Sequence, residues 1–229
     1  MISVIMPTLW KPQHYKIMLP ILNDHPLIGE IIIVDNDISK TDHEILKLEK
    51  VVHLPQETNI YVNPAWNLGV ENARFDKICL LSDDVIFIPS CIEKVYEYLK
   101  PENGIIGFDA DSTISQSTDN PYDFPLLDFG FSSNITPLEK IHFTYGVCMF
   151  MHKESYTKIP ESYKIFFGDV YLFQANKQNK KTNYRIMESM LLTLMHTTSH
   201  STGFKDIVLN DKINYSINLP ELSNLEIKL

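Results

Sequence analysis

Glycine is scarce in this sequence. Only 8 of the 229 residues are glycine, about half of the usual share of roughly 7%. Neither G-x-G-x-x-G nor G-x-x-x-x-G-K-S/T occurs, and these are the motifs whose backbone loops cradle phosphate groups. The composition therefore argues against a nucleotide site built from a glycine-rich phosphate loop.

Positive charge is also in short supply. Lysine and arginine number 20 against 29 aspartates and glutamates, which gives a net charge of −9. Proteins that bind nucleic acids or anionic membranes without specificity lean basic, so we expect neither as a partner. With 44% hydrophobic and 21% charged residues, the composition is ordinary for a globular protein. The length favours one domain with an appendage.

Paired cysteines and long apolar runs are missing as well. Cys79, Cys91 and Cys148 are widely spaced and form no C-x-x-C pair, so we expect neither a disulfide framework nor a zinc knuckle. No apolar run approaches the ~20 residues of a membrane span, and the N-terminus lacks the basic region of a signal peptide. These absences predict a cytoplasmic protein without a membrane span, in a reducing compartment.

Short, fully apolar runs alternate with helical segments in the first half. Runs buried on both faces are typical of strands in a parallel sheet. The expected strands are 2–6, 31–34, 51–54, 77–81 and 104–108. Helices are expected around 17–22, over 44–50, over 65–73 with Asn63 as N-cap and Pro64 first, and from a capping box at Ser90 and Glu93 to Leu99. The pattern predicts a doubly wound α/β fold, a mostly parallel central sheet flanked by helices.

The second half is less regular. Residues 109–140 are acidic and weakly periodic, which indicates a long surface loop, either a lid over an acceptor or a solvated linker. We expect strands over 141–151, 184–187 and 191–195, and a helix over 169–178 with Asp169 near its start. Residues 204–229 form an amphipathic packing tail.

Polar residues follow three of the predicted strands. They are Pro7-Thr8, Asp35-Asn36-Asp37 and Ser82-Asp83-Asp84. Ligands of such sheets bind at the carboxyl ends of the strands. Adjacent carboxylates such as Asp83 and Asp84 are hard oxygen ligands suited to Mg²⁺ or Mn²⁺ shared with a substrate diphosphate. The alternative is an acidic turn that caps the next segment.

In its order of motifs, the sequence resembles glycosyltransferases of the GT-A fold, of the broad family 2 type that uses nucleotide-sugar donors. The matching pieces are Ile2-Ser-Val-Ile-Met-Pro-Thr8, Glu30-Ile-Ile-Ile-Val-Asp-Asn-Asp37, Asn59 with Asn63-Pro-Ala-Trp-Asn-Leu-Gly69, Cys79-Leu-Leu-Ser-Asp-Asp-Val85, Tyr145-Gly-Val-Cys-Met-Phe-Met151 and Phe166-Phe-Gly-Asp-Val-Tyr171. The similarity covers about residues 2–200. In style the chain is similar to the small versions of this fold in large DNA viruses and phages, which would place it in a host cytoplasm.

The resemblance implies a Rossmann-like catalytic domain over 1–203, with a nucleotide-sugar half over 1–108, an acceptor half over 109–203 and the tail over 204–229. It also implies roles for single residues. Those expected to contact the donor are Pro7, Thr8, Asp35 with Asn36 and Asp37 beside it, Asn67, Gly69 and Asp83. Those expected to hold the metal are Asp84 first, then Asp83, with His196 or His200 as a late ligand.

Asp169 matches the general base of the family, on the acceptor side. Breaking the bond between the sugar and the diphosphate builds negative charge that a divalent cation offsets. A carboxylate on the opposite face of the sugar takes the proton of the acceptor hydroxyl, which gives a single displacement with inversion. Burial would raise the pKa of Asp169 and a helix N-terminus would lower it, and the sequence does not decide between them. Without the resemblance, Asp169 reads as an ordinary helix N-cap.

The sequence departs from the family pattern in several places. Ser82 replaces the first acid of the usual Asp-x-Asp motif, and Gly168 stands where an acid often precedes the base. No Q-x-x-R-W follows Asp169, which favours transfer of one sugar over processive synthesis of a polysaccharide. His196 and His200 are four apart but lack the H-E-x-x-H pattern, so a structural role is an alternative for both.

Three other functions compete with glycosyl transfer. A phosphatase of the haloacid dehalogenase type would use Asp35 and Asp37, which form a D-x-D after an apolar strand. A nucleotidyltransferase would share the sheet and the paired acids, although it usually carries a glycine-rich basic loop after the first strand. A sugar- or nucleotide-binding module without catalysis would keep the same residues.

For a glycosyltransferase, we expect a UDP-sugar as donor and a glycan or other hydroxyl compound as acceptor.

Overall fold

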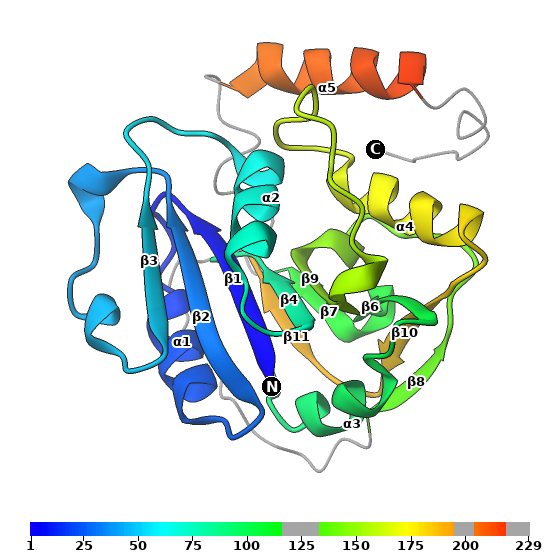
Figure 1. Cartoon of the computed structure of the whole chain (residues 1–229), viewed down its shortest axis with the longest axis horizontal. Helices are drawn as coiled ribbons and strands as arrows, with labels where there is room; N and C mark the ends of the chain where they lie inside the picture. The colour runs from blue at the N-terminus through cyan, green and yellow to red at the C-terminus, as the bar shows by residue number, and fades with distance from the viewer. Residues whose placement is uncertain (116–132, 195–203, 219–229) are drawn as a thin grey trace.

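An eight-stranded sheet forms the centre of the molecule (Figure 1). The computed structural model describes residues 1–115, 133–194 and 204–218. The strand order is β3-β2-β1-β4-β9-β6-β10-β8. The bounds are β1 Ile2–Thr8, β2 Ile28–Asp35, β3 Val51–Pro55, β4 Lys77–Leu81, β6 Asn103–Phe108, β8 Asn134–Pro137, β9 Cys148–His152 and β10 Thr182–Met187.

Strands β3, β2, β1 and β4 run parallel to one another, as the apolar runs predicted. Strand β9 is antiparallel to both β4 and β6, and β8 is antiparallel to β10, so the sheet as a whole is mixed. A smaller sheet has the order β5-β11-β7, with β5 at Val85–Phe87, β11 at Leu191–Thr193 and β7 at Thr113–Ser115. The predicted α/β class with a mostly parallel central sheet is confirmed.

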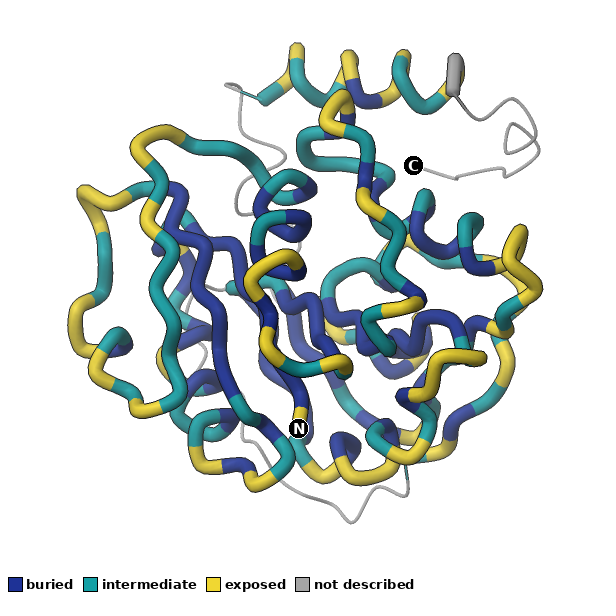
Figure 2. The backbone as a smooth tube through the Cα atoms, in the orientation of Figure 1, coloured by how far each residue is buried: buried dark blue, intermediate teal, exposed yellow. Residues whose placement is uncertain are grey.

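Four helices cover the two faces of the large sheet, α1 Tyr15–Asp24 and α3 Cys91–Tyr98 on one face and α2 Val62–Asn72 and α4 Gly168–Gln178 on the other. A fifth helix, α5, spans Lys205–Asn218. Alternate residues of β1 point to opposite faces, so Val4 packs with α1 and α3 while Ile5 packs with α2 and α4. Burial on both faces explains why these strands carry unbroken apolar runs (Figure 2).

Several expected element bounds are wrong. Residues 44–50 form only a 3-10 turn at Ile45–Lys47, because β3 starts at once and Lys50 is already held by Asn23 at the end of α1. Residues 141–151 form a strand only from Cys148, after a 3-10 turn at Tyr145–Val147. The predicted 109–140 loop contains the strands β7 and β8, although residues 116–132 lie outside the described part.

The starts of three helices differ in detail from the prediction. Helix α2 starts at Val62 with Tyr61 as N-cap, so Asn63 is inside the helix and its amide donates to the Phe166 carbonyl at 3.1 Å. At α3 Ser90 is the N-cap, as predicted, but its side chain makes no capping hydrogen bond. Helix α4 begins at Gly168, with Phe167 as N-cap in a left-handed conformation. Asp169 is therefore in the first turn and is not the N-cap.

Among the described residues, no helix is long and apolar enough to span a membrane.

Helix α5 docks onto the segment that precedes α4, and it lies across the top of the molecule in Figure 1. Asp211 is wholly buried in a helix whose other described residues are exposed or half-buried. Its carboxylate accepts three backbone N–H groups, from Lys164 at 2.8 Å, Ile165 at 2.8 Å and Phe166 at 2.9 Å. Asn214 adds a bond to the Ser162 carbonyl at 3.0 Å. The tail thus fixes the approach to α4 through a buried charged group.

This contact yields a first prediction. Asp211→Ala removes the acceptor of three buried amides, and hydrogen bonds to charged groups contribute about 1.5–3 kcal/mol each. We expect hydrogen exchange at residues 164–166, followed by mass spectrometry, to accelerate at least ~100-fold, which corresponds to about 3 kcal/mol. Asp206→Ala, the same change at an exposed position of α5, is the control. Equal exchange in the two variants would contradict the assigned contact.

Candidate functional site

The predicted polar strand ends meet at the carboxyl edge of the sheet. Thr8 at the end of β1 lies in register with Asp35 at the end of β2, and β4 runs on the other side of β1. The Thr8 hydroxyl donates to the Asp83 carboxylate at 2.7 Å. The structure therefore brings Thr8, Asp35 and Asp83 together.

Asp35 is wholly buried and fully hydrogen-bonded. One oxygen accepts from the Trp10 indole at 2.8 Å and from the Asp37 backbone at 3.0 Å. The other accepts from Thr41 at 2.5 Å and from His53 at 3.0 Å. Burial alone would raise the pKa of Asp35, yet these hydrogen bonds hold its pKa below the ordinary value. In this structure the carboxylate organises the loop around it, and its contact with a base or ribose stays a prediction.

The residues beside Asp35 have different surroundings. Pro7 is buried within β1, in register with Val34. Asn36 is buried, and its side-chain oxygen accepts from the backbone of Ile60 at 3.1 Å, which joins the strand end to the approach to α2. Asp37 pairs with Lys40 at 2.6 Å, and this bond lowers the pKa of its carboxyl. Of the three, Asp37 is the most open to solvent.

Asp83 and Asp84 form a compact acidic pair directly after β4. Asp84 is 8% exposed and accepts from Thr193 of β11 at 3.2 Å. Burial and the neighbouring Asp84 charge raise the pKa of Asp83 to about 7, although Thr8 and the Leu9 backbone donate to it. Among the described residues, no ion pair reaches Asp83.

The donor set of this pair fits a divalent cation. The described residues contain no group of three or more His, Cys, Asp or Glu side chains placed to hold a metal. Mg²⁺ is usually bound by one or two carboxylates, with substrate phosphates and water as the other ligands. Asp83 and Asp84 supply that number of carboxylates. The candidate ligands His196 and His200 lie outside the described residues.

Asn67 and Gly69 serve the packing of α2. The Asn67 amide donates to the Ile159 carbonyl at 2.8 Å and accepts from the Ile159 backbone at 2.9 Å and from the Tyr156 hydroxyl at 2.7 Å. A Cβ on Gly69 would stand 2.2 Å from Ile5, so glycine is what allows α2 to approach β1. Their contact with a donor stays a prediction.

Asp169 lies in the first turn of α4, against the turn that precedes β9. A Cβ on Gly146 would meet its carboxylate at 2.7 Å, so that glycine makes room for the acid. Burial raises the pKa of Asp169 to about 6, while the backbone N–H groups of Val170 and Asp169 itself oppose the shift. Burial therefore changes the pKa of Asp169 more than the N-terminus of α4 does, a comparison that the sequence alone did not decide. Within the described residues, no hydrogen bond joins Asp169 to the acidic pair.

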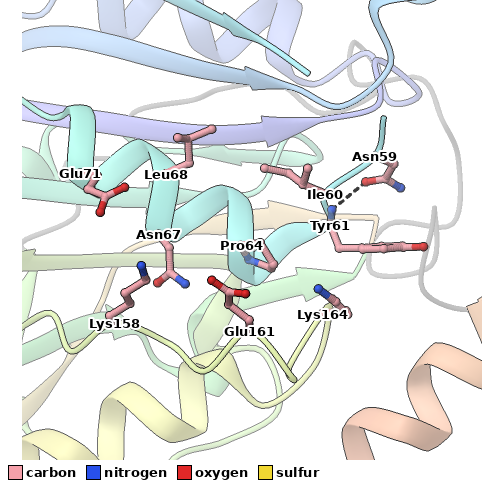
Figure 3. A pocket seen from close by; sticks show the side chains of 10 residues that line it. All are labelled: Asn59, Ile60, Tyr61, Pro64, Asn67, Leu68, Glu71, Lys158, Glu161 and Lys164. Carbon is pink, nitrogen blue, oxygen red and sulfur yellow. Dashed lines mark hydrogen bonds between the residues drawn. The ribbon is translucent and has the colours of Figure 1, made fainter. Parts of the chain in front are cut away.

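A cavity of about 440 Å³ opens between the N-terminal part of α2 and the segment around 158–164 (Figure 3). Its walls mix an aromatic ring, amides, two carboxylates and two ammonium groups. They are formed by Asn59, Ile60, Tyr61, Pro64, Asn67, Leu68, Glu71, Lys158, Glu161 and Lys164. The walls combine these polar groups with the apolar side chains of Ile60, Pro64 and Leu68. Ile60 connects this cavity to the strand ends through Asn36.

Sequence reasoning missed several residues of this region. Trp10, which follows the first strand with a positive φ of 57°, donates its indole N–H to Asp35. Tyr215 of α5 stacks on Phe167 with ring centroids 4.4 Å apart. A tryptophan two residues after a strand end was a usable signal for Trp10. Nothing local marks Asp211 or Tyr215, whose partners are about 45 residues away in the sequence.

Comparison with known proteins agrees with this architecture. The glycosyl transferase family 2 model matches residues 3–159, whereas no curated protein matches the chain in sequence. The crystal structure of residues 1–349 of S. aureus TarS matches with a TM-score of 0.58 and 12% identity, over 100% of this chain and 75% of that TarS fragment. A structure of the same TarS fragment in complex with UDP-GlcNAc matches with a TM-score of only 0.40 and 17% identity, over 51% of this chain and 37% of the fragment.

The TarS likeness concerns the fold alone, because the identity is low. The family model is a match of sequence, and it spans more than half of the 229 residues, including β1, β2, β4 and the acidic pair. The protein belongs to glycosyl transferase family 2.

Proposed function

We propose that this glycosyltransferase moves one sugar from a UDP-sugar to a hydroxyl group of an acceptor, by a single displacement that inverts the anomeric centre. The observation that carries the proposal is the acidic pair Asp83–Asp84 at the carboxyl edge of the sheet. Asp83 has neutral donors as its described partners, and burial raises its pKa to about 7. Two adjacent, largely buried carboxylates are stabilised when a cation and a diphosphate complete the site.

Asp84 and Asp83 would hold Mn²⁺ or Mg²⁺, which supplies compensation for the negative charge on the departing diphosphate. Thr8 fixes the orientation of Asp83 through its hydrogen bond of 2.7 Å. Asp35, Trp10 and His53 keep the end of β2 rigid beside this pair. We assign Pro7, Thr8, Asn36 and Asp37 to the nucleotide pocket, on the grounds that they surround these strand ends.

Asp169 acts as the general base in this proposal. With its pKa raised to about 6, it is deprotonated at neutral pH and still a stronger base than an ordinary carboxylate. It takes the proton of the acceptor hydroxyl while the acceptor oxygen bonds to the anomeric carbon. The bond from that carbon to the diphosphate breaks at the same time, and the electron pair leaves with the diphosphate.

The phosphatase alternative conflicts with the surroundings of Asp35. A carboxylate that attacks phosphorus needs a free lone pair facing the substrate. Each of the two Asp35 oxygens already accepts two hydrogen bonds from the protein. Asp35 is also completely buried.

A sugar-binding module without catalysis would keep the same geometry of the strand ends. Activity measurements separate it from the enzyme.

The second prediction concerns the donor. UDP-GlcNAc is the first compound to test, because its complex with TarS has been crystallised. A ligand that binds only the folded state stabilises it by about 2.7 kcal/mol at 100 times its Kd. We expect UDP with Mn²⁺ to raise the melting temperature by several degrees, and UDP or Mn²⁺ alone to raise it less. No shift with any of a panel of UDP- and GDP-linked nucleotides would contradict the proposal.

The third prediction concerns the cation. Asp84→Asn removes one charged ligand and should lower the affinity for Mn²⁺ in the presence of UDP at least tenfold, measured by calorimetry. Asp24→Asn, at an exposed position at the end of α1, is the matched control and should bind as the wild type does. Wild-type affinity in the Asp84 variant would remove Asp84 from the metal site.

The fourth prediction concerns the base. Asp169→Asn should bind UDP with Mn²⁺ normally but lose sugar transfer by ~100-fold or more. In the wild type saturated with donor and Mn²⁺, a bound cation would keep Asp83 deprotonated, so kcat should fall as the pH drops through about 6, where the Asp169 carboxylate becomes protonated. The titratable groups coupled to it are Tyr145 and Tyr215, whose pKa values are raised by burial and which stay neutral in this range.

The same variant offers a readout on stability. A carboxyl whose pKa is higher in the folded state loses stabilisation as the pH rises from about 4 to about 6. The stability of Asp169→Asn minus that of the wild type should therefore be larger at pH 7 than at pH 4.

Sugar transfer by Asp169→Asn at the wild-type rate would exclude Asp169 as the base.

A further inference from the structure

Tyr215 reaches the catalytic end of α4 from α5, a helix that the sequence indicated only as a packing tail. Its ring stacks on Phe167, with centroids 4.4 Å apart and an angle of 15° between the rings. Phe167 is the N-cap of α4 and stands two residues before Asp169. Asp211 lies one helical turn before Tyr215 in α5. Its carboxylate accepts hydrogen bonds from the backbone of Lys164, Ile165 and Phe166.

The hydroxyl of Tyr215 is buried and has no hydrogen-bond partner among the described residues. Leaving a buried polar group unpaired costs about 1–3 kcal/mol. Helix packing alone does not require this hydroxyl, since phenylalanine would stack on Phe167 equally well. A buried hydroxyl without a protein partner is a group that a water molecule or a ligand can complete.

The surroundings of this hydroxyl point to the catalytic carboxyl group. Burial raises the pKa of Tyr215, and the charges of Tyr163 and Asp169 add to the shift, so the Tyr215 phenol and the Asp169 carboxyl lie within electrostatic reach. No direct hydrogen bond joins the two groups in the described residues. A hydroxyl group that reaches both such a donor and such a base can bond to the two at once.

We propose that Tyr215 is an acceptor-binding residue, whose hydroxyl donates a hydrogen bond to the attacking oxygen of the acceptor beside Asp169. This inference rests on the proposed function. The acceptor oxygen uses one lone pair to attack the anomeric carbon and the other to accept from Tyr215. Its proton goes to Asp169, and the sugar–diphosphate bond breaks with its electrons leaving on the diphosphate. Helix α5 is then part of the active site, and Asp211 is the positioning residue that sets its place.

The test uses water as the acceptor, because the natural acceptor is not needed to measure release of the nucleotide. Water has the same two lone pairs and occupies the same position beside Asp169. Full-length wild type and Tyr215→Phe are compared with Mn²⁺ and the UDP- or GDP-sugar that the wild type hydrolyses fastest. We expect nucleotide release to slow at least tenfold in the variant, with the Kd for UDP unchanged within about twofold and the melting temperature not lowered.

Tyr98→Phe is the matched control, because it removes a phenol from α3 whose ring contacts Tyr184, away from α4. It should behave as the wild type. If the wild type neither binds nor hydrolyses any donor, the proposed function fails and this inference fails with it. If the wild type is active and Tyr215→Phe matches it, only this inference is overturned. Loss of UDP affinity or a lower melting temperature in Tyr215→Phe would also overturn it, since either would show a role in donor binding or in folding.

Discussion

The concentration of carboxylates at one edge of a parallel sheet is the constraint on which the rest of the site depends. The alignment of β1, β2 and β4 brings Asp35, Asp83 and Asp84 to the same edge. Protein donors satisfy Asp35 completely, through Trp10, Thr41, His53 and the chain at Asp37. Within the described residues, the donors that reach Asp83 are neutral, and its pKa stays raised. The difference separates a structural acid from the acidic pair that, in our proposal, a cation and a diphosphate complete.

Glycine is used sparingly, and two glycines show what it is used for. Gly69 lets α2 approach Ile5 of β1, and Gly146 leaves room for the Asp169 carboxylate. Neither belongs to a phosphate-binding loop. This agrees with the proposed site, in which carboxylates and a cation hold the diphosphate. It also shows that the buried environment of Asp169 is built into the backbone, because no larger residue fits at Gly146 without displacing the acid.

The strands around the site were predictable because their signal is local. Runs such as 31–34 are buried on both faces and end in acids, so their positions follow from residues next to one another. The helix predicted over 44–50 does not form, because the short connection to β3 is held at Lys50 by Asn23 and leaves no length for α-helical turns. The partners of Asp35, the engaged amide of Asn67 and the contacts of Asp211 involve residues far apart in the sequence, which pattern analysis does not join. The pKa of Asp169 was open for the same reason, since burial is a property of the fold.

A crystal of the protein with UDP and Mn²⁺, measured at the manganese absorption edge, tests the central claim most directly. The account predicts an anomalous peak about 2.1–2.2 Å from a carboxylate oxygen of Asp84. It also predicts the diphosphate on that ion and the nucleoside along the ends of β1 and β2. A peak away from Asp83 and Asp84, or UDP bound at another part of the molecule, would contradict it.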